Sequence, residues 1–336
     1  MIVSIQYMRA IAVLLVIFYH AMSKGKIYSG TSWDWLNFGE AGVDLFFIIS
    51  GYIMCYATYR KKTNIYEFIK ARIIRIMPLY WILSTVALLI YLVMPDKINS
   101  SGGDTSILNS FSLIPSSSKF LIQNGWTLSY EFFFYIIFSF GLIFSAFKKH
   151  LIPVIILTIL VILGQLFRPD NVYLGFMTNS ILIEFIMGIA VFNLAQKYSF
   201  SRNVSLFLCL AGISLLAYIS DWAETNNRVI GYGIPCLLFF IGMTNLENDL
   251  QKNKHNPVGK ILGKIGDSSY STYLIHPFFL VLASLIASKL GLVNFGNLFI
   301  ITLVIGSVLT GWICYITLEK PINKLIKDKV KNKVKK

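Results

Sequence analysis

Apolar runs long enough to cross a lipid bilayer recur along the whole chain, and they limit what it can fold into. A helix spans the bilayer core with about 20 apolar residues, and several runs here are near the lower limit of about 17. Backbone polar groups in hydrocarbon must be hydrogen-bonded within the chain, as they are in helices. The sequence therefore predicts an all-α, polytopic membrane helix bundle with about ten transmembrane helices. The expected spans are residues 5–23, 41–59, 77–95, 127–146, 151–167, 173–195, 204–220, 229–245, 268–288 and 296–318.

The composition supports this class and narrows the partners. Hydrophobic residues make up 56% of the chain and charged residues 14%, whereas soluble domains average about 25% charged residues. The net charge of +14 would also suit a protein that binds nucleic acid. However, the lysines and arginines lie in short connections between the apolar runs and in the C-terminal segment, a pattern typical of membrane orientation. We expect the lipid bilayer to be a partner and nucleic acid not to be one.

The distribution of positive charge predicts which way the chain lies in the membrane. If the N-terminus is cytoplasmic, the cytoplasmic segments hold 22 of the 30 lysines and arginines, and the outer loops hold seven. Cytoplasmic loops carry the excess of these residues in membrane proteins. Both termini are therefore expected in the cytoplasm. We expect one transmembrane domain over residues 1–320 and a basic cytoplasmic tail over residues 321–336.

The first apolar run carries Arg9 near its start and His20 near its end. Eleven residues separate them, which on a helix is three turns plus about 20°, so both lie on one face. The rise between them is about 16 Å. Charged side chains in apolar helices are expensive and usually functional. This face is therefore a candidate for a functional site.

A pair of arginines follows the second span on the expected cytoplasmic side. Arg72 and Arg75 are three residues apart, so they share one side of a helix. Pro78 is expected to break or kink that helix as it enters the third span. Guanidinium groups hold phosphate oxygens bidentately, so this pair together with Arg9 suits a phosphate-bearing ligand. The alternative is that the pair only anchors the chain at the cytoplasmic surface, and both interpretations stay open.

Several polar side chains are expected in the outer half of the bilayer. In "GWTLSYE", Trp126 is expected at the outer interface, with Glu131 about 7 Å deeper along a helix. His20 reaches a similar depth, so Glu131 could orient it as a general base, or the two could simply tie their helices together. Asp44 lies near the outer end of the second span and could line the same cavity. Trp126 and Asp44 are candidates for binding the substrate.

Two further motifs concern helix structure. His276 precedes Pro277, which is expected to end a half-helix at mid-bilayer and to free backbone carbonyl groups. A structural role is favoured for His276, which we also count as a candidate for substrate binding. Gly51, which follows Ser50, predicts a close contact between two helices.

The cysteines give no sign of a disulfide framework or of a metal site. All four lie within or beside apolar runs, with no paired spacing. We expect them to pack in the core, and we expect neither a metal nor a permanently bound cofactor. The four are Cys55, Cys209, Cys236 and Cys314.

Six motifs occur in a specific order along nearly the whole chain, and together they carry a family resemblance. The chain resembles the acyltransferase-3 family of integral membrane O-acyltransferases, in particular its exopolysaccharide O-acetyltransferase-like branch. The motifs are Arg-x10-His (residues 9–20), "FFIISGY" (46–52), "RIIRIMPLY" (72–80), "GWTLSYE" (125–131), "SYSTYLIHP" (269–277) and "EKP" (319–321).

The resemblance implies a bundle of about ten helices in the bacterial cytoplasmic (inner) membrane, crossing it many times. It implies transfer of an acyl group, usually acetyl, from an acyl-CoA such as acetyl-CoA to a sugar hydroxyl. The acceptor would be a cell-surface or exported polysaccharide or its lipid-linked precursor. O-antigen of lipopolysaccharide, capsule and peptidoglycan remain open as acceptors.

The resemblance also implies roles for particular residues. His20 matches the family's essential histidine and Arg9 its partner, while Arg72 and Arg75 match the arginine pair linked to donor binding. His20 would then deprotonate the acceptor hydroxyl directly, with Glu131 holding the imidazolium, or it would be acylated transiently. Both routes remain open.

Two other functions are compatible with a polytopic chain. A membrane transporter or flippase of a glycan-export system also carries intramembrane charges and broken helices, although no inverted repeat is detectable here. A structural subunit of such a system is less consistent with the sequence. It would not need three polar groups in hydrocarbon, Arg9, His20 and Glu131, because burying each of them there is energetically unfavourable.

Overall fold

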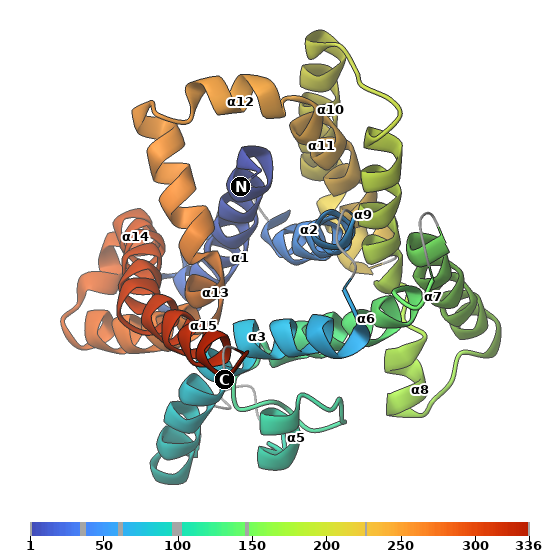
Figure 1. The fold of residues 1–336 in the computed structure, drawn as a ribbon. Coiled ribbons are helices and arrows are strands. Elements are labelled where there is room, and N and C mark those ends of the chain that lie inside the picture. Colours follow the sequence, from blue (N-terminus) through green and yellow to red (C-terminus); the bar gives the residue numbers. More distant parts are fainter. Residues whose placement is uncertain are drawn as a thin grey trace. The chain divides into compact units, whose positions relative to one another are not determined.

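The chain is helical throughout the part that the structure describes (Figure 1). This structure is a computed structural model, and it describes residues 2–33, 38–59, 63–95, 103–144, 148–225 and 227–334. These residues form no strand beyond an isolated bridge between Thr105 and Lys119. The all-α class predicted from the apolar runs is therefore confirmed.

Each expected span coincides with a helix or a pair of helices. Within the described residues, eight helices are long and apolar enough to cross a membrane. A ninth crossing results if Val229–Asn245 and Glu247–Asn253, which meet at a 64° bend, form one span. The expected span at residues 127–146 coincides with a helix of 17 residues, Gly125–Gly141. The chain is thus a multi-pass membrane protein.

The elements include both long spans and short connecting helices. They are α1 (Val3–Ser29), α2 (Ala41–Thr58), α3 (Ile65–Val93), α5 (Ile107–Ser112), α6 (Gly125–Gly141), α7 (Lys148–Phe167), α8 (Val172–Met177), α9 (Leu182–Ala195), α10 (Arg202–Thr225), η2 (Val229–Gly233), α11 (Ile234–Asn245), α12 (Glu247–Asn253), α13 (Pro257–Lys289), η3 (Leu292–Phe295), α14 (Gly296–Cys314), η4 (Tyr315–Glu319) and α15 (Lys320–Val334).

The helices gather into two compact units. Unit 1 comprises Met1–Arg60 and Ile183–Trp312, and unit 2 comprises Lys61–Leu182 and Ile313–Lys336. Unit 1 therefore joins the beginning of the chain to a segment that lies far along the sequence.

The core of unit 1 is α1, which lies alongside α13 and α2 (Figure 1). α2 also contacts α9, and a small residue allows the close approach of these two helices. A Cβ atom on Gly51 of α2 would collide with the backbone of α9 at Phe185 and Gly188. Small residues let helix backbones meet in this way within a membrane. The close helix contact predicted at Gly51 is confirmed.

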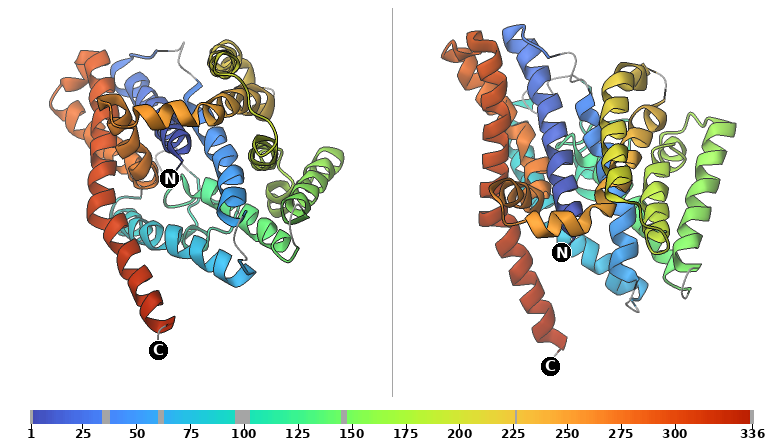
Figure 2. Two further views of the ribbon diagram at one scale, coloured as in Figure 1. Left: turned by 45° about the horizontal axis from the view of Figure 1, so that its top comes forward. Right: turned by 90° about the horizontal axis from the view of Figure 1, so that it is seen from above.

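The short helix α12 passes the N-terminal end of α1 (Figure 2). The carboxylate of Glu247 accepts hydrogen bonds from the backbone N–H groups of Val3 and Ser4, at 2.9 and 2.7 Å. The first turn of a helix leaves such N–H groups without partners inside the helix, and a carboxylate there also complements the helix dipole. Glu247 thus completes the start of α1.

The break expected at Pro277 was wrong, and Pro78 does not break its helix either. α13 continues through Pro277, and α3 continues through Pro78. A proline removes one backbone hydrogen bond, and a membrane helix tolerates this where nearby groups compensate. In α13, the ring of His276 contacts the carbonyl group of Thr272, next to the Tyr273 carbonyl group that Pro277 leaves without its usual donor. His276 therefore lies inside a continuous helix and not at the end of a half-helix.

Unit 2 is built on α3, which packs against α6 and α15 (Figure 1). The phenol of Tyr80 on α3 donates a hydrogen bond of 2.6 Å to the carbonyl oxygen of Ser110 on α5. The expected basic tail forms α15, and its last two positions, 335 and 336, lie outside the described residues. In both units the four cysteines are buried and unbonded to one another, so their predicted packing role is confirmed.

Candidate functional site

Unit 1 brings His20 of α1 against His276 of α13. The two ring centroids are 5.4 Å apart, and the ring planes are inclined at 30°. The sequence singled out both histidines but did not pair them. Because α1 is one helix from Val3 to Ser29, Arg9 and His20 also share that helix, as predicted.

His276 presents a nitrogen that can accept a hydrogen bond. Its Nδ1 lies 3.1 Å from the carbonyl oxygen of Thr272, and a carbonyl oxygen can only accept. Nδ1 therefore carries the hydrogen, and Nε2 carries the lone pair. His276 is fully buried, and its Nε2 has no hydrogen-bond partner among the residues described. A buried acceptor of this kind is usually paired, so a missing partner points to a ligand.

Charged groups of unit 1 act on the His20 ring. The carboxylate of Glu40, just before α2, and the ammonium group of Lys24 interact with it electrostatically. A carboxylate near an imidazole stabilises the imidazolium form. The sequence assigned this role to Glu131, which belongs to α6 of unit 2. The pairing with Glu131 stays a prediction, and within the unit that holds His20 the structure shows a carboxylate, that of Glu40, acting on it.

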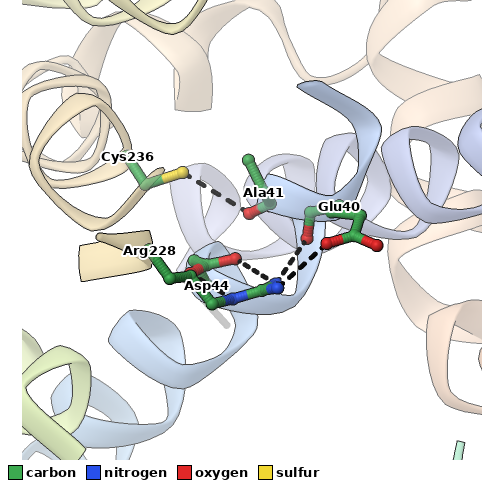
Figure 3. Close-up of polar contacts among 5 residues, drawn as sticks. All are labelled: Glu40, Ala41, Asp44, Arg228 and Cys236. Atoms are coloured by element: carbon green, nitrogen blue, oxygen red, sulfur yellow. Dashed lines mark hydrogen bonds and ion pairs between the residues drawn. The ribbon is translucent and has the colours of Figure 1, made fainter. Parts of the chain in front are cut away.

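A second cluster is centred on Arg228, the residue just before η2, and ties it to the start of α2 (Figure 3). The guanidinium group of Arg228 binds both carboxylate oxygens of Asp44, with Nε–Oδ1 at 3.0 Å and Nη2–Oδ2 at 2.7 Å. Nη1 donates to Oε2 of Glu40 at 3.0 Å, and Nη2 also reaches the main-chain oxygen of Glu40 at 3.3 Å. Bidentate arginine–carboxylate pairs are the stronger kind of ion pair.

This cluster changes the interpretation of Asp44. The sequence placed Asp44 among the substrate-binding candidates, and the structure shows it fully buried and bonded to Arg228. Burial opposes the charge of the guanidinium group, yet the pKa of Arg228 is raised above its ordinary value because Asp44 and the other carboxylates favour the charged form. Asp44 thus holds Arg228 in place, and Arg228 in turn holds Glu40.

Glu184 of α9 is a functional candidate that the sequence interpretation missed. It is fully buried within reach of Asp44, and neither carboxyl oxygen meets a donor in the described part of the chain. The sequence does contain an indication of a functional role, since Glu184 is an isolated acid in the apolar run "ILIEFIMGIAVF". Arg228 was missed because a tally of loop charges treats every arginine as solvated.

Unit 2 holds the arginine pair and Glu131. Arg72 lies over the ring of Phe68, with 5.7 Å between its Cζ and the ring centroid. Its Nε is buried, and no acceptor among the described residues meets it. Arg75, which is exposed, and Glu131 both act electrostatically on Arg72. The predicted pair therefore occupies one helix and includes a buried donor atom that suits an anionic ligand.

Trp126 begins α6 in unit 2, where its ring meets the edge of Tyr130 at 6.0 Å. Tyr130 in turn stacks on Phe176 of α8 at 4.2 Å. These three rings form an aromatic group between α6 and α8 of unit 2. Such groups suit membrane interfaces and sugar rings alike.

Within the described ranges, no group of three or more histidine, cysteine or acidic side chains is arranged to hold a metal ion.

A multi-pass helical protein with paired histidines and buried ion pairs in its bundle belongs to the membrane proteins that bind or transform polar ligands. A family comparison specifies this further. The acyltransferase-3 family, described as an acyltransferase domain, matches residues 2–319, and the chain belongs to this family. The resemblance seen in the six motifs is thereby confirmed.

Individual relatives agree with the family. The chain is 29% identical over 300 residues to the exopolysaccharide production protein ExoZ of Rhizobium meliloti, covering 84% of this chain and 89% of that protein. It is 27% identical to the putative peptidoglycan O-acetyltransferase YrhL of Bacillus subtilis, over 65% of this chain and 39% of that protein. It is 26% identical to O-acetyltransferase OatA of Staphylococcus aureus, over 63% of this chain and 38% of that protein. No solved structure matches the chain.

Proposed function

We propose that this protein is a membrane O-acyltransferase that moves an acetyl group from acetyl-CoA to a sugar hydroxyl. The acceptor is a cell-surface or exported polysaccharide, or its lipid-linked precursor. The family match over residues 2–319 carries this proposal, together with a histidine pair inside the helix bundle. The relatives named for exopolysaccharide production and for O-acetyl transfer support the acceptor class and the acyl group.

His20 is the general base in this proposal. A sugar hydroxyl is a weak nucleophile, so transfer requires a group that removes its proton. As the hydroxyl oxygen bonds to the acyl carbon, the carbon–sulfur bond of the thioester breaks, and the proton on His20 passes to the departing thiolate. In the alternative route, His20 itself carries the acyl group between donor and acceptor.

His276 and Glu40 support His20. The lone pair on Nε2 of His276 accepts a hydrogen bond from the acceptor hydroxyl and orients it. We assign stabilisation of the His20 imidazolium to Glu40, because Glu40 acts on His20 within unit 1. Glu131 then serves as the counter-charge of Arg72 in the absence of the donor. When the donor binds, its phosphate groups take over this role.

The arginines bind the donor. Arg72 and Arg75 hold the phosphate groups of the acyl-CoA, for which guanidinium groups are well suited. Arg9 lies about 16 Å from His20 along α1, a reach that suits an extended pantetheine arm. With both termini in the cytoplasm of a bacterium, the donor enters from the cytoplasmic side of the inner membrane and the acceptor is presented on the outer side.

The test uses purified protein in detergent with radiolabelled acetyl-CoA. We expect the wild type to release thiol or to label itself, and His20→Ala to lose both signals. Arg72→Ala is expected to weaken donor binding. His255→Ala is the matched control, because His255 is an exposed histidine in the turn before α13. A folded His20→Ala protein with full transfer activity contradicts the proposal, and failure of every form to bind the donor favours a transporter or flippase.

A further inference from the structure

The cluster around Arg228 contains more acids than bases. Three carboxyl groups, those of Glu40, Asp44 and Glu184, surround this arginine. The other titratable group facing Glu184 is the Cys236 thiol, which donates to the carbonyl oxygen of Ala41 at 3.5 Å (Figure 3). A neutral thiol supplies no positive charge, so the charges balance poorly if all three acids are ionised.

The hydrogen bonds of Arg228 show which acids it compensates. It binds Asp44 through two bonds, and it binds Glu40 through one bond to the carboxylate and one to the main-chain oxygen. None of these bonds reaches Glu184. The guanidinium group of Arg228 therefore directs these hydrogen bonds to Asp44 and Glu40.

Arg228 acts on Glu184 through space, but it makes no hydrogen bond to it among those the structure describes. Both oxygens of Glu184 are buried, and as a carboxylate it would face no donor in the described part of the structure. An ionised carboxylate in such a place is strongly unfavourable, and a neutral carboxyl group is not. A protonated carboxyl group can also donate, and Asp44 is within its reach.

We infer that Glu184 is a buried proton-binding site that stays protonated and donates a hydrogen bond to Asp44. The helix crossing supports this arrangement, because Gly188, one turn after Glu184, packs against the backbone of α2 at Ile48 and Tyr52. Glu184 then fixes Asp44, Asp44 fixes Arg228, and Arg228 fixes Glu40. If the proposed function holds, Glu184 is a positioning residue that acts on His20 through this chain of contacts.

The protonation state is tested without any catalytic measurement. Infrared difference spectroscopy of wild type against Glu184→Gln should show the loss of a carbonyl stretch that only a protonated carboxyl group has. Glu247→Gln is the matched control, because the Glu247 side chain already accepts hydrogen bonds from two backbone N–H groups. A spectrum in which Glu184→Gln removes only carboxylate bands overturns the inference.

A second test compares the same chemical change at two acids. Glu184→Gln keeps a neutral donor to Asp44, so it should change the melting temperature in detergent by less than about 2 °C. Asp44→Asn leaves Arg228 without its main partner, so it should lower the melting temperature by more than about 5 °C. Acetyl transfer should fall at least about tenfold in Asp44→Asn and less than about threefold in Glu184→Gln.

Equal damage from the two substitutions would mean that Glu184 is ionised, and would overturn the inference. The infrared and melting measurements do not depend on transfer. A protein that transfers no acetyl group but shows the protonated band would therefore contradict the proposed function and leave the proton site standing.

Discussion

The ring of His276 lies 5.4 Å from that of His20, although 256 positions separate them in the sequence. The two helices that carry these residues, α1 and α13, pack side by side in unit 1. Through this contact, a base at one residue and a hydrogen-bond acceptor at the other can address the same hydroxyl group.

Replacing His276 should therefore impair transfer more than donor binding. We expect His276→Ala to lower acetyl transfer at least about tenfold, because the Nε2 lone pair that orients the acceptor is lost. Equilibrium binding of acetyl-CoA should stay within about threefold of wild type, since His276 makes no contact with the donor phosphates in the proposed arrangement. Transfer equal to that of the His255→Ala control would contradict this role.

Neutralising Glu40 should slow transfer while keeping the fold. Glu40→Gln preserves an oxygen that accepts from Nη1 of Arg228, but it removes the charge that faces His20. We expect the turnover rate to fall about threefold to tenfold, because the imidazolium form is less stabilised. Glu131→Gln is the variant for comparison. If it loses more turnover than Glu40→Gln while its donor binding is unchanged, then Glu131, and not Glu40, stabilises the His20 imidazolium.

The contact between α2 and α9 should not tolerate an added methyl group. A Cβ atom on Gly188 would overlap the carbonyl oxygen of Ile48, so Gly188→Ala must push the helices apart. We expect a loss of about 1–3 kcal/mol in the free energy of unfolding, measured by thermal melting in detergent. Gly175→Ala is the control, because its Cβ atom would meet the nearest atom, the Pro169 carbonyl oxygen, at 3.6 Å.

Removing the acid that completes α1 should weaken unit 1. Glu247→Ala takes away the acceptor of the Val3 and Ser4 N–H groups, and we expect a loss of about 1 kcal/mol. Asp249→Ala removes an exposed ion pair with Arg202 at 3.6 Å and should have almost no effect. Comparable melting temperatures for the two variants would show that the contact with α12 adds no stability.

The sequence predicted the helices and the polar positions within them, because these depend on local periodicity and on the expense of charge in hydrocarbon. Arg9 and His20 share one helix, and Gly51 marks a close helix contact. The prediction that Pro277 ends a half-helix was wrong, since α13 continues through it, and a membrane helix can tolerate a proline in its interior.

The pairing of the polar groups could not be predicted in the same way. Residues from several helices reach one depth in the bilayer, and only packing decides which of them meet, so the pairing of Glu131 with His20 stays a prediction. The contact between His20 and His276 depends on α1 packing against α13. Likewise, nothing in its local sequence shows that Arg228 turns back onto α2.

The hydrogen bonds from α1 to Glu247 also constrain the order of assembly. Val3 and Glu247 are 244 residues apart, so at ordinary rates of synthesis roughly 12 to 50 seconds separate their emergence from the ribosome. All residues of unit 2 from 61 to 182 are made in that interval. The first turn of α1 therefore stays without these hydrogen bonds during that interval, and unit 1 is completed only after most of unit 2 has been synthesised.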